Sequence, residues 1–224
     1  MTNAAALPDA TIAIIGGTGK LGAAIGYRLG KAGRRVILGS RSAESAAAKA
    51  AELGFGLTGM GNVDAARAGD VLILTVPFAA QEATLAEIAT HAAGKILCDT
   101  TVPLVPPKVM RVQMPTEGSA ALRAQGLLGE QVTVVSGFHN VAAHKLATDA
   151  DIGCDVLVFG DDKAARSVVV ELANQAGLRG LHGGALANSA AAEALTSVLI
   201  FMNKTYRVDG AGIRITGDLV PLED

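Results

Sequence analysis

A glycine-rich turn between a short apolar run and a helix-like segment constrains this chain more than any other feature. Ile12–Ile15 leads into Gly17-x-Gly19-x-x-Gly22. In this pattern Gly17 permits a tight turn, Gly19 lets the backbone approach a pyrophosphate, and Gly22 lets the helix pack closely on the strand. With 27 glycines in 224 residues, the motif alone is weak. Its strand and helix context nevertheless predicts a dinucleotide-binding unit, with phosphates at the helix N-terminus.

Apolar runs alternate with helix-like segments along the chain. The strand-like runs are Ile12–Ile15, Arg35–Gly39, Val71–Val76, Lys95–Cys98, Val132–Ser136 and Val156–Phe159. The helix-like segments are Leu21–Ala32, Ser42–Leu53, Ala79–Ala92, Lys163–Ala176 and, approximately, Ser119–Gln125 and Asn188–Tyr206. The apolar runs lack strict alternation, which is typical of strands buried on both faces of a parallel sheet. The order predicts the α/β class: a Rossmann-type doubly wound, mainly parallel sheet with a small helical C-terminal part.

We expect a domain boundary near residue 160. Residues 1–160 would form the dinucleotide-binding domain, and residues 161–224 a small part that closes the ligand cleft. In the last helix Leu195, Val198, Leu199 and Met202 share one face, which fits either domain core or a dimer interface. The Pro-rich segment 101–126 is either a loop over a ligand or a surface connection. A short strand is expected at Gly212–Gly217.

Composition excludes several classes of function. The net charge of −2 argues against a general nucleic-acid binder. The N-terminal ten residues have no basic residue and no long apolar core, and polar residues interrupt the apolar stretch Ala185–Met202, so we expect no signal peptide, no membrane span and a cytoplasmic location. Cys98 and Cys154 lie in apolar runs and are expected to be buried, without a disulfide or a metal.

The end of the second expected strand indicates which dinucleotide binds. An NAD-binding unit usually carries a carboxylate there, about 20 residues past the glycines, but this chain has Gly39-Ser40-Arg41. Arg41 offers a charged donor fork, and Ser40 a hydroxyl, for a 2′-phosphate. The sequence therefore predicts a preference for NADP, unless Arg41 is an ordinary solvated arginine.

Thr75, Val76 and Pro77 follow the third apolar run. In an open α/β sheet the ligand lies across the carboxyl ends of the strands. These three residues would then flank the ribose and nicotinamide side of the cofactor. The alternative is a plain junction between strand and helix.

Several motifs in one order resemble the NADPH-dependent reductases of the deazaflavin coenzyme F420. They cover the chain from about Thr11 to Asp218 and are Gly16–Gly22, Gly39–Arg41, Thr75–Pro77, Ser136–Ala143, Gly160–Asp162, Ala187–Ser189 and Gly212–Gly217. The resemblance implies reversible hydride transfer between NADP(H) and an 8-hydroxy-5-deazaflavin, bound in a cleft between a Rossmann domain and a small C-terminal part. It also implies a homodimer.

The resemblance also implies ligand contacts. For the pyrophosphate they are Thr18, Gly19, Lys20 and Leu21. For the 2′-phosphate they are Ser40 and Arg41. For the deazaflavin and nicotinamide they are His139, Val141, Ala143, Asn188 and Ser189. A basic residue common in the family after Gly39–Arg41 is replaced by Ser45, with Lys49 one turn further, and Ala142 stands where some members have proline.

Hydride transfer between two rings depends mainly on positioning, so no general acid is assigned. His139 is the expected polar partner of the deazaflavin. Three alternatives stay open: an NADPH-dependent flavin reductase, an imine or carbonyl reductase, and a non-enzymatic NADP(H)-binding sensor. The second is disfavoured because only about 60 residues follow the expected sheet and they hold few lysines.

Overall fold

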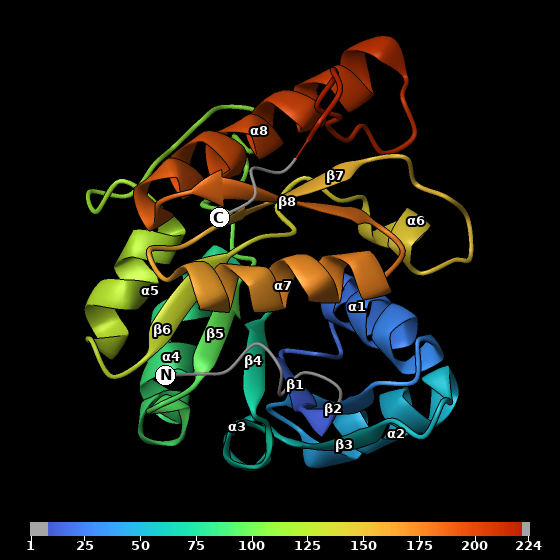
Figure 1. The fold of residues 1–224 in the computed structure, drawn as a ribbon, viewed down its shortest axis with the longest axis vertical. Coiled ribbons are helices and arrows are strands. Elements are labelled where there is room, and N and C mark those ends of the chain that lie inside the picture. Colours follow the sequence, from blue (N-terminus) through green and yellow to red (C-terminus); the bar gives the residue numbers. More distant parts are fainter. Residues whose placement is uncertain (1–8, 221–224) are drawn as a thin grey trace.

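An eight-stranded sheet forms the centre of the molecule, in the order β3-β2-β1-β4-β5-β6-β7-β8 (Figure 1). The computed structural model describes residues 9–220. The strands are β1 (Thr11–Ile15), β2 (Arg35–Ser40), β3 (Thr58–Gly61), β4 (Val71–Leu74), β5 (Ile96–Asp99), β6 (Thr133–Ser136), β7 (Asp155–Phe159) and β8 (Arg179–Gly184). Strands β1 to β6 pair in parallel. The expected doubly wound, mainly parallel sheet is confirmed.

Helices cover both faces of this sheet. They are α1 (Lys20–Lys31), α2 (Ala43–Leu53), α3 (Asn62–Ala68), α4 (Phe78–Ala92), α5 (Ala120–Leu128), α6 (Ala143–Leu146), α7 (Lys163–Gln175) and α8 (Ser189–Tyr206), with a 3-10 turn, η2, at Leu186–Asn188. Alternate residues of β1 enter different clusters: Ile12 and Ile14 pack with α1, α2 and α7, whereas Ala13 and Ile15 pack with α3, α4 and α5. Burial on both faces of the sheet therefore explains why apolar and polar residues do not alternate along these strands.

One backbone pair joins the parallel strands to the last two. Strand β7 is antiparallel to β6, with Ser136 opposite Phe159, and β8 is parallel to β7. The division expected near residue 160 falls between β7 and α7, and β8 returns to the same sheet (Figure 1). That division stays a prediction.

Several elements differ from those expected. Four elements of the structure were not expected from the sequence: β3, α3, α6 and β8. The strand expected at Gly212–Gly217 is wrong, because this segment has no ladder. Two hydrogen bonds with Asp155 hold the segment beside the start of β7. The Asp155 N–H donates to the Ile213 carbonyl (2.8 Å), and the Ile215 N–H donates to the Asp155 carboxylate (2.6 Å).

Helix α8 turns polar side chains toward the rest of the protein. Glu193 and Ser197 are buried on its inner side, and Ser197 donates to the Arg111 carbonyl in the loop before α5. The expected apolar face is split: Leu199 is buried, whereas Val198 and Met202 are exposed. Within residues 9–220, none of the helices is long and apolar enough to cross a membrane.

Candidate functional site

A cleft of about 290 Å³ opens where β1, β2 and β4 end. Seven of the predicted ligand residues line it: Thr18, Gly19, Ser40, Arg41, Thr75, Val76 and Pro77. Gly16, Asn62, Ala80 and Thr84 complete the wall. None of these lining residues is acidic, and Arg41 brings a positive charge. This cleft is therefore suited to an anionic ligand that spans the glycine turn and the end of β2.

The turn after β1 depends on two neighbouring glycines with different roles. Gly16 has a φ of +77°, and a Cβ there would also lie 2.7 Å from Val76 Cγ1. Gly16 is the left-handed residue of the turn. Gly17 closes the turn, because its N–H donates to the Ile14 carbonyl (3.1 Å) and to the Gly39 carbonyl (2.8 Å), and a Cβ there would lie 2.8 Å from the Ile14 carbonyl oxygen. This close approach agrees with the role expected for Gly17, and Gly16 is a second glycine that the turn requires.

The start of α1 leaves room and donors for phosphate. A Cβ on Gly22 would lie 2.5 Å from Thr75 Oγ1, so glycine is needed where the helix meets the end of β4. Gly19 precedes the helix in an extended conformation, and no side chain caps it. The first-turn N–H groups at Lys20 and Leu21 therefore remain available for an anion, as expected for a pyrophosphate site.

Ser40 and Arg41 lie beside this turn. The Thr18 and Ser40 hydroxyls are 3.4 Å apart, which joins the glycine turn to the end of β2. Arg41 is exposed in the cleft, and its guanidinium makes no hydrogen bond or ion pair with another residue in the described part of the chain. Lys49 forms an ion pair with Glu52 (2.5 Å). Arg41 thus brings an exposed basic side chain to the cleft, and its contact with a 2′-phosphate stays a prediction.

Thr75, Val76 and Pro77 form the opposite wall, at the end of β4. Thr75 is fixed by its hydroxyl, which donates to the Ile15 carbonyl (3.0 Å). Pro77 precedes α4 in an extended conformation and stands at its N-cap. The strand ends at Leu74, two residues earlier than expected, and this leaves Val76 as a partly buried apolar surface on the cleft.

His139 lies in a second cavity, of about 170 Å³, which Val141 and Thr196 also line. Its Nε2 is 2.9 Å from Ser136 Oγ, while Nδ1 is buried without a hydrogen-bond partner. Burial lowers the pKa of His139 to about 4, so the ring is neutral at neutral pH. A neutral imidazole with one nitrogen fixed and the other without a partner is suited to hydrogen bonding with a polar ring edge.

The remaining predicted residues are placed differently. Ala143 begins α6 and is partly buried. Asn188 is exposed, and its side-chain amide donates to the Gly183 carbonyl (3.1 Å). Ser189 is fully buried and donates to the Ser119 hydroxyl (2.9 Å), so in this conformation it holds α8 against the start of α5. The contacts of Asn188 and Ser189 with a deazaflavin, and of Ala143 with the nicotinamide, stay predictions.

Comparisons with known proteins agree along almost the whole chain. Residues 11–103 match the family described as NADP oxidoreductase, coenzyme F420-dependent. The chain is 40% identical to the F420-dependent NADP reductase of Methanocaldococcus jannaschii, over 92% of this chain and 97% of that protein. The chain belongs to the F420-dependent NADP reductase family. The reductase of the same name from Methanothermobacter thermautotrophicus is 41% identical, over 92% of this chain and 94% of that protein.

Solved structures support the fold of this family member. One from Arthrobacter sp. FB24, with a provisional name as an F420-dependent NADP reductase, superposes with a TM-score of 0.79 at 22% identity, covering 92% of this chain and 99% of that one. An imine reductase variant from Myxococcus stipitatus in complex with NAD+ gives a TM-score of 0.64 at 18% identity, covering 88% of this chain and 62% of that one. These likenesses concern the fold alone.

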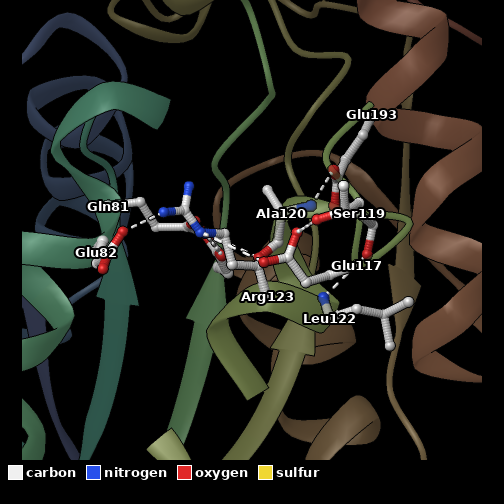
Figure 2. A network of polar contacts seen from close by, with 10 residues as sticks. Gln81, Glu82, Glu117, Ser119, Ala120, Leu122, Arg123 and Glu193 are labelled. Atoms are coloured by element: carbon white, nitrogen blue, oxygen red, sulfur yellow. Dashed lines mark hydrogen bonds and ion pairs between the residues drawn. The ribbon is translucent and has the colours of Figure 1, made fainter. Parts of the chain in front are cut away.

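A buried polar network connects α8, through α5 and α4, to the end of β5 in the sheet. Figure 2 shows Glu193 reaching from α8 to the first turn of α5, where its carboxylate accepts from the N–H groups of Ala120 (2.6 Å) and Ala121 (3.2 Å). Gln81 of α4 bridges the same turn to the Asp99 carboxylate (2.6 Å). Burial raises the pKa of Glu193 to about 7, despite the hydrogen bonds that it accepts.

Sequence reasoning missed three cleft residues: Asn62, Ala80 and Thr84. Ala80 and Thr84 lie one turn apart on α4, and Asn62 begins α3, an element that was not expected. The helical spacing after Pro77 could have indicated the first two. For Asn62 the signal was the step Gly61-Asn62, a helix start at the end of a glycine-containing strand.

Proposed function

We propose that this protein transfers a hydride reversibly between NADP(H) and the deazaflavin coenzyme F420. The observation that carries the nucleotide assignment is the cleft in which the glycine turn, Ser40 and Arg41 meet without an acidic side chain. Family membership along almost the whole chain carries the second substrate. When both are bound, a hydride passes from the reduced nicotinamide to the deazaflavin and a proton completes the product.

The residues of this chain bind the two substrates, orient them and exclude water from between them. The first turn of α1 would hold the pyrophosphate of NADP, and Arg41 would hold its 2′-phosphate, because the helix N-terminus and the end of β2 offer these donors from fixed elements. Val76 and Pro77 give the nicotinamide an apolar wall, and Gly16 keeps that wall close. Such positioning is what brings the reacting carbons to roughly 3–3.5 Å.

His139, Val141, Asn188 and Ser189 are proposed to hold the deazaflavin, with Ala143 near the nicotinamide. His139 supports this best, because its Nδ1 is buried without a partner while Ser136 fixes the other nitrogen. The ring contributes hydrogen bonding rather than charge, since its pKa is lowered to about 4. We assign it as a ligand contact and assign no proton-transfer residue.

We further propose a cytoplasmic homodimer. Cys98 and Cys154 are buried and unpaired, which suits a reducing compartment. The outer side of α8 exposes Val198, Phe201 and Met202, and a second copy would bury these side chains.

The test is an absorbance assay that follows oxidised F420 with NADPH, with NADH and FMN in parallel. Arg41→Ala should raise the KM for NADPH about 10- to 100-fold with little effect on NADH, because a charged hydrogen bond contributes about 1.5–3 kcal/mol. Arg35→Ala, an exposed arginine at the other end of β2, is the matched control and should change neither value.

Three other outcomes contradict the proposal or part of it. Turnover of FMN but not of F420 would make the protein a flavin reductase. Tight NADPH binding with no turnover of either acceptor would make it a sensor. An equal effect of Arg41→Ala on NADPH and NADH would remove the assigned 2′-phosphate contact.

A further inference from the structure

Asn62 lies in the wall of the cleft, between the two phosphate-binding segments. It is the first residue of α3 and follows Gly61, which pairs with Ser40 in the sheet. Its side chain is 3% exposed, yet it contributes to the cleft lining. A buried amide at the edge of a ligand cleft needs partners for both its oxygen and its nitrogen.

The oxygen of this amide has its partner. Asn62 Oδ1 accepts from the Gly16 N–H at 3.3 Å, at the left-handed residue of the glycine turn. The same oxygen faces Gly39, where a Cβ would lie only 3.0 Å away. The Asn62 side chain thus lies between the glycine turn and β2, the strand that ends at Ser40 and precedes Arg41.

The nitrogen of the Asn62 amide has no hydrogen-bond partner within the described residues. Because Oδ1 must accept from the Gly16 N–H, Nδ2 is the donor half, and this orientation is fixed. Among residues 9–220, Nδ2 makes no hydrogen bond, and the side chain lines the cleft. The cleft offers this donor to a ligand.

We propose that Asn62 is a further NADP-binding residue. Its Oδ1 holds the Gly16 turn, and its Nδ2 donates to an oxygen of the adenosine–pyrophosphate half of the nucleotide. The inference deepens the proposed function: it depends on NADP binding, and it does not depend on which acceptor takes the hydride.

Two substitutions separate the roles of the oxygen and the nitrogen. Asn62→Asp keeps an oxygen for the Gly16 N–H but removes the donor and adds negative charge beside phosphates. It should weaken NADP+ binding by about 30-fold or more. Asn62→Ala removes both atoms and should weaken binding about tenfold, so it provides a second measurement if the aspartate variant does not fold.

Asn174→Ala is the matched control. Asn174 Oδ1 accepts from the Gly180 N–H at 2.9 Å, a contact of the same kind away from the cleft. This variant should bind NADP+ like the wild type. Binding is measured by calorimetry with NADP+ alone, and kinetics should show the KM for NADPH raised with kcat within about twofold, because uniform binding is lost.

Each result decides the inference. NADP+ binding of Asn62→Asp equal to the wild type would overturn it, as would a loss in Asn62→Ala without one in Asn62→Asp, which would leave only a structural role for Oδ1. Wild-type protein that binds NADP+ but does not reduce F420 would refute the proposed function and leave this inference standing. Wild-type protein that does not bind NADP+ would refute both.

Discussion

Replacing Glu193 with glutamine should change how stability depends on pH. Glu193 is 1% exposed, and burial raises the pKa of its carboxyl from 4.5 to about 7. Between these values the unfolded chain has released the proton while the folded protein keeps it. Raising the pH therefore favours the unfolded state over this interval, and the loss is complete once the folded carboxyl ionises.

The size of the effect follows from the same interval. From pH 4.5 to about 7, at ~1.4 kcal/mol per pH unit, wild type loses about 3 kcal/mol of unfolding free energy. Glu193→Gln has no such proton. The difference in unfolding free energy between variant and wild type should therefore shift by about 3 kcal/mol toward the variant between about pH 5 and about pH 8.

Urea unfolding followed by circular dichroism at several pH values measures this difference. Glu171→Gln, at an exposed position on α7, is the control and should show a constant difference from wild type. A constant difference for Glu193→Gln as well would refute the reasoning about burial. A shift in the opposite direction would mean that the two N–H groups at the start of α5 outweigh the cost of desolvation.

Three further predictions concern other parts of the molecule. Gly22→Ala should destabilise the fold by about 1–3 kcal/mol and weaken NADP+ binding, because its Cβ would lie 2.5 Å from Thr75 Oγ1; thermal unfolding and calorimetry measure both, and unchanged values would contradict the close packing. Arg179→Met should lower the midpoint of urea unfolding at neutral pH, because it leaves the buried Asp155 carboxylate without its two 2.7 Å hydrogen bonds from the guanidinium, and an unchanged midpoint would argue against this. His139 should give no inflection in kcat/KM for F420 from about pH 5.5 to about pH 8, because its pKa is lowered to about 4; an inflection that disappears in His139→Gln would contradict this.

The parallel core of the sheet could be predicted because its strands are continuous apolar runs. The two missed strands have a common physical cause. Gly59 in β3 and Gly180 and Gly183 in β8 resemble loop residues, yet each is needed because a neighbour packs on the strand. A Cβ on Gly59 would lie 2.1 Å from the Ala46 carbonyl carbon, and one on Gly183 would lie 2.3 Å from the Phe159 ring. Glycine there indicates close approach, which only the tertiary structure shows.

The candidate site divides in the same way. The glycine turn, Ser40 and Arg41 could be predicted because their contacts depend on a local strand–turn–helix unit. Glu193 could not, since its partner Ala120 is 73 residues away in the sequence. In the sequence it is only an acidic residue that interrupts an apolar helix. Asn62 was missed with its helix, because the preceding glycines concealed β3.

The single backbone pair between β6 and β7 determines how the two parts of the sheet share mechanical load. Only Ser136 and Phe159 face each other across it, whereas the other neighbouring strands are joined by longer ladders. Side chains of Val156, Val158 and Val169 surround Gly137 beside this pair. A force across the junction is therefore carried by this apolar packing and by the hydrogen bonds of Ser189 and Glu193 to the start of α5, rather than by a row of backbone hydrogen bonds.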